Sequence, residues 1–325
     1  MSSVSSVSLL AEAVTHAHGR FVAHRRSRPG EPLPVPVISV GNIAFGGRAK
    51  TPLVAALAQA AQEDGLRPAV ITRGYRRRGR GTALAVGAPG DVAPWLGSID
   101  IDGVWRTLPE AVGVLGDEAA WLAATLRGVP VAVDADRPAA ARALLAHHRV
   151  DVILLDDGFQ HPMPRDVDVV VIRPGDGAGG RPCREPAASL ARADHLLVLD
   201  PAGDLRRRPG RLRTLGDGSD AAIPRGVRVL CGVADAGSVA RVAELAGLTV
   251  ISMHDLGDHR GPGRRRRRSL APSQEVPWLL TEKDAVGWAA ARPPPGPALV
   301  LGLELDGVAA LWSQIRADLR AAIRD

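Results

Sequence analysis

Short apolar runs rich in β-branched residues recur along the first 200 residues of this chain, and most of them end at a polar or glycine turn. Segments with helical spacing lie between them, at residues 52–63, 117–126 and 137–148. Runs of this kind are typical of buried strands in a parallel sheet, joined by crossover helices. The pattern therefore predicts an α/β fold. The expected strands end near Val40, Thr72, Val133, Leu155, Ile172 and Leu199.

Residues 201–225 are rich in Gly, Asp and Arg and have weak periodicity, which predicts a boundary or an exposed excursion. We expect a core domain over residues 1–222, beginning with an amphipathic helix over residues 1–28. A smaller α/β domain should follow over residues 223–325, and its final helix is a candidate to pack back on the core. Its expected strands are 227–231, 248–252, 278–280 and 298–303, and its expected helices are 238–245 and 308–323.

Charge and aromatic content narrow the classes of partner. The net charge is +6, and only two of the 41 basic side chains are lysine, at Lys50 and Lys283. Such a surplus suits anionic partners. Aromatic residues are 3% of the chain, so no nucleic acid partner is expected. Cys183 and Cys231 are too few for a disulfide framework or a zinc site, and no protein partner is implied.

Neither a membrane-spanning run of about 20 apolar residues nor a secretory signal is present in the sequence. The basic amphipathic segment over residues 1–28 suits an anionic membrane surface. An ordinary helix that covers the core is the favoured interpretation, and a helix on the membrane surface is the alternative.

A glycine-rich turn after the run Val35–Val40 leads into Lys50 and Thr51 and then into a helix. In phosphate-binding loops, backbone N–H groups at the helix start hold phosphate oxygens, the lysine reaches the β- and γ-phosphates, and the hydroxyl ligates Mg²⁺. An ordinary β–α turn is the alternative, because the strict pattern needs glycine at positions 44 and 49. The candidate nucleotide-binding residues are Ala44, Phe45, Gly46, Gly47, Arg48, Ala49, Lys50 and Thr51.

Four apolar residues precede Asp156 and Asp157, which places a carboxylate at the C-terminal edge of a strand. There it can hold Mg²⁺ beside the phosphate loop. A solvated Asp-Gly turn is the alternative. Together the two motifs predict a site for a nucleoside triphosphate with Mg²⁺, and a parallel sheet of the P-loop NTPase type flanked by helices.

The complete set of motifs resembles the tetraacyldisaccharide 4′-kinase family, the lipid A 4′-kinases. The matches run in the family's order over about residues 35–285, and the Asp-Asp-Gly-Phe-Gln-His string at 156–161 is the most specific of them. The others are the loop at 35–52, Arg73-Gly74-Tyr75, Gly116-Asp117-Glu118, Arg165-Asp166, Arg184-Glu185-Pro186, Arg192-Ala193-Asp194, Asp258-His259 and Thr281-Glu282-Lys283-Asp284.

The resemblance implies transfer of the γ-phosphoryl group of ATP to the 4′-hydroxyl of a lipid A disaccharide 1-phosphate, at the cytoplasmic face of the inner membrane. It assigns catalysis to Asp117, His259 and Lys50, with Asp117 taking the proton of the sugar hydroxyl. It assigns Mg²⁺ binding to Thr51, Asp156 and Asp157, and ATP binding to Gln160. Lys283 has no assigned role. The implied substrate residues are Arg73, Tyr75, Arg137 and Glu185.

On the predicted boundary, Asp117 and His259 come from different domains, so the active site is expected between the domains. Two alternatives remain. One is another phosphate-loop enzyme, a small-molecule kinase or a nucleotide-driven metallochaperone. The other is a catalytically weakened relative that binds nucleotide or lipid, which Ala49 suggests. The run Arg264–Arg268 is expected to be a solvated loop, with a lipid-headgroup or nucleic-acid site as the alternative.

Overall fold

The computed structural model describes residues 6–27, 30–90, 92–178, 181–257, 270, 275–289 and 293–322. His259 and the run Arg264–Arg268 lie outside these residues. The chain forms two compact units, each assembled from separate stretches of sequence. The first unit comprises residues 1–73, 136–206 and 305–325, and the second comprises residues 74–135 and 207–304.

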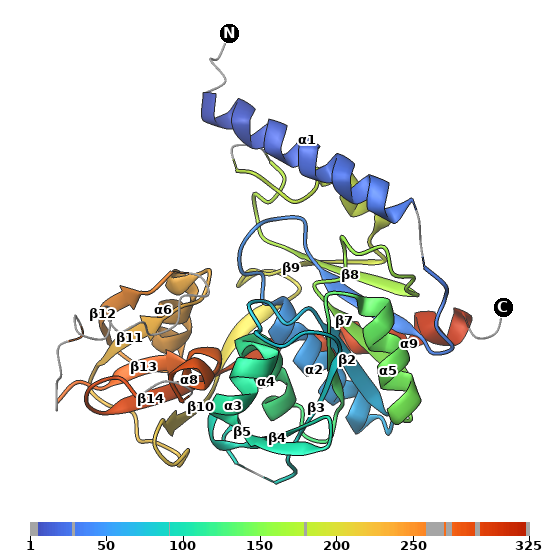
Figure 1. The fold of residues 1–325 in the computed structure, drawn as a ribbon. Helices are drawn as coiled ribbons and strands as arrows, with labels where there is room; N and C mark the ends of the chain where they lie inside the picture. The colour runs from blue at the N-terminus through green and yellow to red at the C-terminus, as the bar shows by residue number, and fades with distance from the viewer. Residues whose placement is uncertain are drawn as a thin grey trace. The chain divides into compact units, whose positions relative to one another are not determined.

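A parallel sheet forms the centre of the first unit (Figure 1). Its strands lie in the order β2 (Pro68–Thr72), β7 (Val152–Asp156), β1 (Val37–Gly41), β8 (Val167–Ile172) and β9 (His195–Val198), and each neighbouring pair is parallel. Every residue of β1, β2 and β7 is buried, as expected for central parallel strands covered on both faces. The predicted α/β architecture is confirmed here.

Four α-helices belong to the described part of the first unit, namely α1 (Ser6–Arg26), α2 (Lys50–Glu63), α5 (Arg137–His147) and α9 (Val308–Ala322). Helix α2 buries Leu53, Leu57 and Ala61, which are spaced four residues apart, and packs on β1, β2 and β7. Helix α9 packs on α2, where Trp312 Nε1 donates a hydrogen bond to Asp64. A short 3₁₀ segment, Ala187–Arg192, precedes β9.

The second unit contains antiparallel strands, of which only the one that ends at Val133 was expected from the sequence. They are β5 (Val104–Thr107), β4 (Ser98–Ile101), β3 (Ala83–Gly87) and β6 (Val131–Val133), in that order. The predicted strand ending near Val133 thus pairs antiparallel with β3. Helices α3 (Leu108–Leu115) and α4 (Asp117–Thr125) accompany them, and the 3₁₀ turn Pro94–Leu96 precedes β4.

A five-stranded sheet completes the second unit. Its order is β10 (Arg206–Thr214), β14 (Ala298–Asp306), β13 (Trp278–Thr281), β11 (Val227–Cys231) and β12 (Val250–Asp255), with helices α6 (Ala236–Leu245) and α8 (Glu282–Ala289). The expected strands and helix of this region are present. Residues 201–225 were expected to be irregular, but they contain β10. Gly210 in that strand lies so close to Gly302 that a Cβ would sit 3.2 Å from its carbonyl carbon.

The two units do not coincide with the predicted division at residue 222. Residues 74–135 cluster with the C-terminal sheet because α3 and α4 pack on α8, whereas α9 clusters with the first unit. Among the helices that the structure describes, none is long and apolar enough to cross a membrane.

Candidate active site

The turn between β1 and α2 ends in a strained residue. Ala49, the N-cap of α2, has φ 54° and ψ 27°, the left-handed conformation that favours glycine, and it forms no side-chain cap hydrogen bond. The loop therefore keeps the backbone shape that glycine would give it, at a conformational cost. The first turn of α2 presents N–H groups that the N-cap side chain does not satisfy, which suits an anion.

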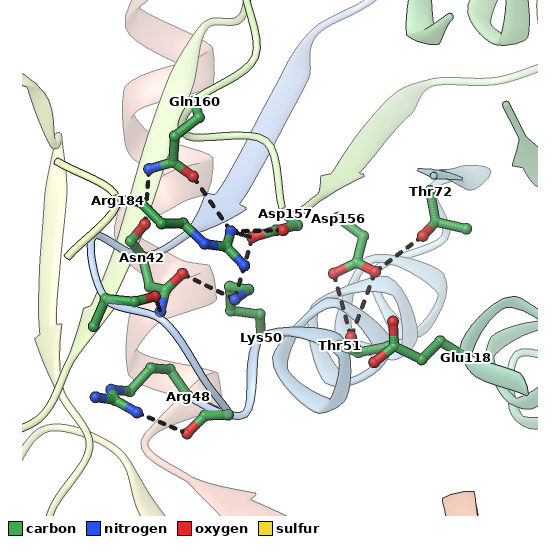
Figure 2. A network of polar contacts seen from close by, with 12 residues as sticks. Asn42, Arg48, Lys50, Thr51, Thr72, Glu118, Asp156, Asp157, Gln160 and Arg184 are labelled. Carbon is green, nitrogen blue, oxygen red and sulfur yellow. Dashed lines mark hydrogen bonds and ion pairs between the residues drawn. The ribbon is translucent and has the colours of Figure 1, made fainter. Parts of the chain in front are cut away.

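Lys50 occupies the first helical position and is held on two sides (Figure 2). Its Nζ lies 2.9 Å from Asn42 Oδ1 and 3.2 Å from Asp157 Oδ1. The amide of Asn42 is fixed in turn, because its Nδ2 donates to the carbonyl of Ala44 at 2.7 Å. The ammonium group is thus held in place beside the turn and the helix start.

Asp157 lies between two cations. Arg184 Nη1 donates to both of its carboxylate oxygens at 2.7 Å, and Lys50 contacts Oδ1. Burial alone raises the pKa of Asp157, but the charges of Lys50 and Arg184 outweigh it and hold the pKa well below its usual range. The carboxylate is therefore an anchor for the two cations. The sequence had suggested a metal ligand at this position.

Asp156 ends strand β7 and is 3% exposed. Thr51 Oγ1 lies 3.4 Å from each of its oxygens, and Thr72 Oγ1 lies 3.1 Å from Oδ2. The Thr51 contacts are longer than ordinary O–H···O hydrogen bonds. A hydroxyl and a carboxylate that face each other at this spacing, without a short bond, are a fitting pair of ligands for a hard cation.

Three polar residues surround this site, of which Glu185 and Arg137 are buried and Gln160 is partly buried. Gln160 Nε2 donates to the Asn42 carbonyl at 2.8 Å and to Glu185 Oε1 at 2.9 Å. Glu185 is 2% exposed and also accepts from Arg192 Nη2. Burial lowers the pKa of Arg137, while Asp156 and Asp157 oppose that shift. The guanidinium remains charged at any physiological pH.

Some candidate residues point elsewhere. The Arg48 guanidinium donates to both oxygens of Asp176, at 2.7 and 2.6 Å, so its side chain is engaged away from Lys50. Phe45, at the tip of the loop, is 46% exposed. Arg73 is exposed in the first unit, and Tyr75 is exposed in the second, where Arg76 lies over its ring.

The second unit carries its own polar cluster. Asp117 and Glu118 open helix α4, and Lys283 Nζ lies 2.6 Å from Glu118 Oε1. Burial lowers the pKa of Lys283, but Glu118 and Asp117 outweigh it, and the net pKa is raised. Asp284 accepts from the Gly232 N–H and from Thr281 Oγ1. Asp117 and Lys283 thus lie in the same unit, although the predicted boundary separates them.

Sequence reasoning missed three residues that hold the site together. Asn42 fixes Lys50, Arg184 fixes Asp157 and Thr72 contacts Asp156. Asn42 and Arg184 lie inside recognised motifs and Thr72 ends a predicted strand, so their positions were the available signal. Polar side chains at the C-terminal ends of parallel strands converge on one edge of the sheet.

Comparisons with known proteins agree along nearly the whole chain. A profile of the family described as tetraacyldisaccharide-1-P 4′-kinase matches residues 3–320. A tetraacyldisaccharide 4′-kinase from Azoarcus sp. (strain BH72) is 38% identical over 286 residues, covering 80% of this chain and 76% of the relative. One from Pseudomonas putida is 36% identical over 296 residues, covering 86% and 81%.

A crystal structure of LpxK from Aquifex aeolicus in complex with ATP has the same fold. The TM-score is 0.67 at 23% identity, over 96% of this chain and 99% of that one. The chain therefore belongs to the tetraacyldisaccharide-1-P 4′-kinase family.

Proposed function

We propose that this protein is an ATP-dependent kinase that transfers the γ-phosphoryl group of ATP to the 4′-hydroxyl of a tetraacyldisaccharide 1-phosphate, in lipid A biosynthesis. The observation that carries the proposal is the placement of Lys50. Asn42 and Asp157 hold its ammonium at the start of α2, beside the buried carboxylate of Asp156. Family membership over residues 3–320 supplies the acceptor.

The nucleotide's phosphates fit the turn before α2. Lys50 is placed to neutralise the β- and γ-phosphates. The N-cap residue Ala49 has no side-chain acceptor, so the first-turn N–H groups of α2 are left to donate to phosphate oxygens. The relative of known structure binds ATP, which supports the same nucleotide here. Because Ala49 already adopts the left-handed conformation, the loop needs no glycine there to take this shape. That observation disfavours a catalytically weakened relative.

Mg²⁺ fits Thr51 and Asp156. In the described part of the chain, no group of three or more His, Cys, Asp or Glu side chains forms a metal cage. Mg²⁺ commonly takes one or two protein ligands and completes its shell with phosphate oxygens and water, so the pair is sufficient. The ion supplies charge neutralisation on the phosphates when bound. We keep Asp157 as the anchor of Lys50 and Arg184.

We assign Asp117 to accept the proton of the 4′-hydroxyl and His259 to orient that hydroxyl, on the family motifs. Arg137 and Glu185 are assigned to the surroundings of the transferred group, and Arg73 and Tyr75 to the disaccharide substrate. Most of the rate enhancement then comes from positioning and charge neutralisation, as in other phosphoryl transfers. Asp117 lies in the first turn of α4.

The substrate is a lipid, so we place the protein peripherally at the cytoplasmic face of the inner membrane. The face of α1 that carries Phe21 and Arg25 is exposed, and Arg25 lies 5.8 Å from the centre of the Phe21 ring. Apolar and cationic side chains together suit an anionic membrane surface.

The direct test is transfer of radiolabelled phosphate from Mg²⁺–ATP to the disaccharide 1-phosphate in non-ionic mixed micelles. We expect wild-type protein to form the 4′-phosphorylated product, and Lys50→Met to lose at least about 10²-fold in rate. Arg149→Met, which removes an exposed cation, is the matched control. A wild-type protein that binds Mg²⁺–ATP in a thermal-shift assay but forms no product would support the weakened-relative alternative instead.

A further inference from the structure

Helix α1 contacts the rest of the first unit through the face opposite its exposed one. One side of α1 faces the rest of the first unit, whereas Phe21 and His24 on the other side are exposed. The inner side carries residues that recur at helical spacing, namely Ala11, Thr15, His18, Gly19, Val22 and Arg26. Ala11 and Val22 are 5% and 2% exposed. Arg26 Nη1 donates to the carbonyl of Phe159 at 2.6 Å. From Ala11 to Arg26 the helix is therefore docked, with a defined inner face.

The middle of that inner face lies against residues 183–186 (Figure 1). Thr15 Oγ1 accepts a hydrogen bond from the Cys183 N–H at 2.8 Å. His18 Nδ1 lies 2.6 Å from the Arg184 carbonyl oxygen, so Nδ1 carries the proton. Gly19 fits because it has no side chain, since a Cβ would sit 2.9 Å from Pro186 Cδ. Three α1 residues at i, i+3 and i+4 thus contact residues 183, 184 and 186 of one segment.

On its other side, this segment borders the start of the phosphate loop. The Arg184 N–H donates to the Ile43 carbonyl at 2.6 Å, and Ala44 forms an isolated bridge with Cys183. Residues 181–186 lie in neither a helix nor a strand. Their position therefore depends on the contacts at both sides, from α1 and from residues 43–44.

The side chains of this segment reach the proposed active site. Arg184 binds both oxygens of Asp157, which contacts Lys50. Glu185 binds Gln160, which donates to the Asn42 carbonyl. The Arg184 guanidinium also lies 6.0 Å from the centre of the Phe45 ring, and His18 meets the same ring edge-on at 5.9 Å. One continuous set of contacts thus leads from α1 to Lys50.

We propose that α1 is a support of the active site, and that Thr15, His18 and Gly19 position Arg184 and Glu185 for phosphoryl transfer. This inference rests on the proposed kinase function and adds a second task to a helix whose outer face suits a membrane. His18 is a positioning residue, because it touches the backbone of Arg184 and none of the groups assigned to substrate. Small displacements of positioned groups are costly in phosphoryl transfer, of order 10²-fold for about 1 Å.

The first test separates kcat from KM in mixed micelles. We expect His18→Leu to lower kcat about tenfold or more, while KM for ATP changes less than about twofold, because α2 and Lys50 keep their own contacts. His18→Asn retains a donor near the Nδ1 position and should restore most of kcat. His16→Leu is the matched control, since His16 is exposed and bonds to the Glu12 carbonyl of its own helix. Equal kcat values for His18→Leu and His16→Leu would overturn the inference.

The second test needs no kinase activity. Amide hydrogen exchange in the folded protein is followed at Cys183 and Arg184, whose N–H groups donate to Thr15 and Ile43. We expect His18→Leu and Gly19→Ala to speed exchange at both amides relative to His16→Leu, and unchanged exchange would refute the support role. A wild-type protein without kinase activity would refute the proposed function alone, since the exchange result still decides whether α1 holds this segment.

Discussion

Ala49 shows how one residue can preserve a loop at a cost. A left-handed backbone costs a non-glycine residue roughly 1–2 kcal/mol, and Ala49 has φ 54°. We predict that Ala49→Gly raises the free energy of unfolding by about 1 kcal/mol, because glycine removes this strain. Ala56→Gly, inside helix α2, should instead lower it by about 1 kcal/mol. Urea unfolding of the two variants measures both, and changes of the same sign would contradict the strain argument.

The position of Lys283 is explained by its ion pair with Glu118. Its ammonium pairs with Glu118 at 2.6 Å, close to Asp117, inside one unit. We predict that Lys283→Met lowers the free energy of unfolding by about 1–3 kcal/mol, since it leaves Glu118 without this counter-charge. Lys283→Arg should lose less, because it keeps a positive charge.

The pH dependence of the Lys283 effect follows from the direction of its pKa shift. A cation whose folded pKa is raised contributes its full stability below the unfolded value of 10.5 and loses it only as pH rises through the folded pKa. The stability difference between wild type and Lys283→Met should therefore stay constant from about pH 7 to 9. A difference that shrinks across this range would show that the ion pair is not its origin.

At the scale of elements, sequence patterns predicted most of what surrounds the proposed nucleotide site. Strands β1, β2 and β7 are fully buried, and a fully buried strand reads as a continuous apolar run. Strands β4 and β5 were missed because Asp100 and Arg106 interrupt four-residue strands, and the side chains of β5 are largely exposed. Strand β10 was missed because Pro209 and Gly210 usually mark loops, and only its tertiary neighbour β14 explains them.

The site shows the same limit. Motifs pointed to Lys50, Thr51 and Asp156 as candidates because phosphate and metal binding require those residue types. They did not reveal that Asp157 pairs with Lys50 and Arg184, or that Arg48 pairs with Asp176. Those pairings depend on residues more than 100 positions apart or on loop conformation, which periodicity does not encode.

Helix α9 owes its place to a contact that can be tested alone. Trp312 is 4% exposed, and its Nε1 donates to Asp64 at the C-terminus of α2. We predict that Trp312→Phe keeps an aromatic ring but lowers the free energy of unfolding by about 1–2 kcal/mol, because a part-buried hydrogen bond to a charged group is lost. Trp105→Phe, at a residue 57% exposed, should change it by less than about 0.5 kcal/mol. Equal losses in urea unfolding would contradict the role of the Asp64 bond.

For the molecule as a whole, His161 is expected to shape stability in mild acid. It is 9% exposed, and its Nδ1 accepts from the Met163 N–H at 3.1 Å. Burial, followed by the charges of Arg137 and Arg25, lowers its pKa from 6.5 to about 4. Between these pH values the histidine is protonated in the unfolded chain but neutral in the folded protein, so the free energy of unfolding falls as pH falls.

We therefore predict that His161 contributes a slope of up to about 1.4 kcal/mol per pH unit between about pH 6.5 and 4. His161→Asn keeps an acceptor for Met163 but does not titrate, so its stability profile should be flatter in this window. His147→Asn, at an exposed histidine, is the control and should keep the wild-type slope. Denaturant midpoints measured across the window decide the prediction, and identical slopes for His161→Asn and wild type would count against it.

The division of the chain also decides which fragments can fold. The second unit draws on residues 74–135 and 207–304, and Trp288 of α8 is 1% exposed where α8 packs on α3 and α4. A fragment of residues 223–325 lacks α3, α4 and β10, so it leaves that apolar surface uncovered. We predict that this fragment shows no cooperative thermal transition, whereas residues 74–135 joined to 207–304 by a Gly/Ser linker show one by near-ultraviolet circular dichroism. Cooperative unfolding of residues 223–325 alone would place the domain boundary at residue 222, because it would show that this fragment forms a complete core without α3 and α4.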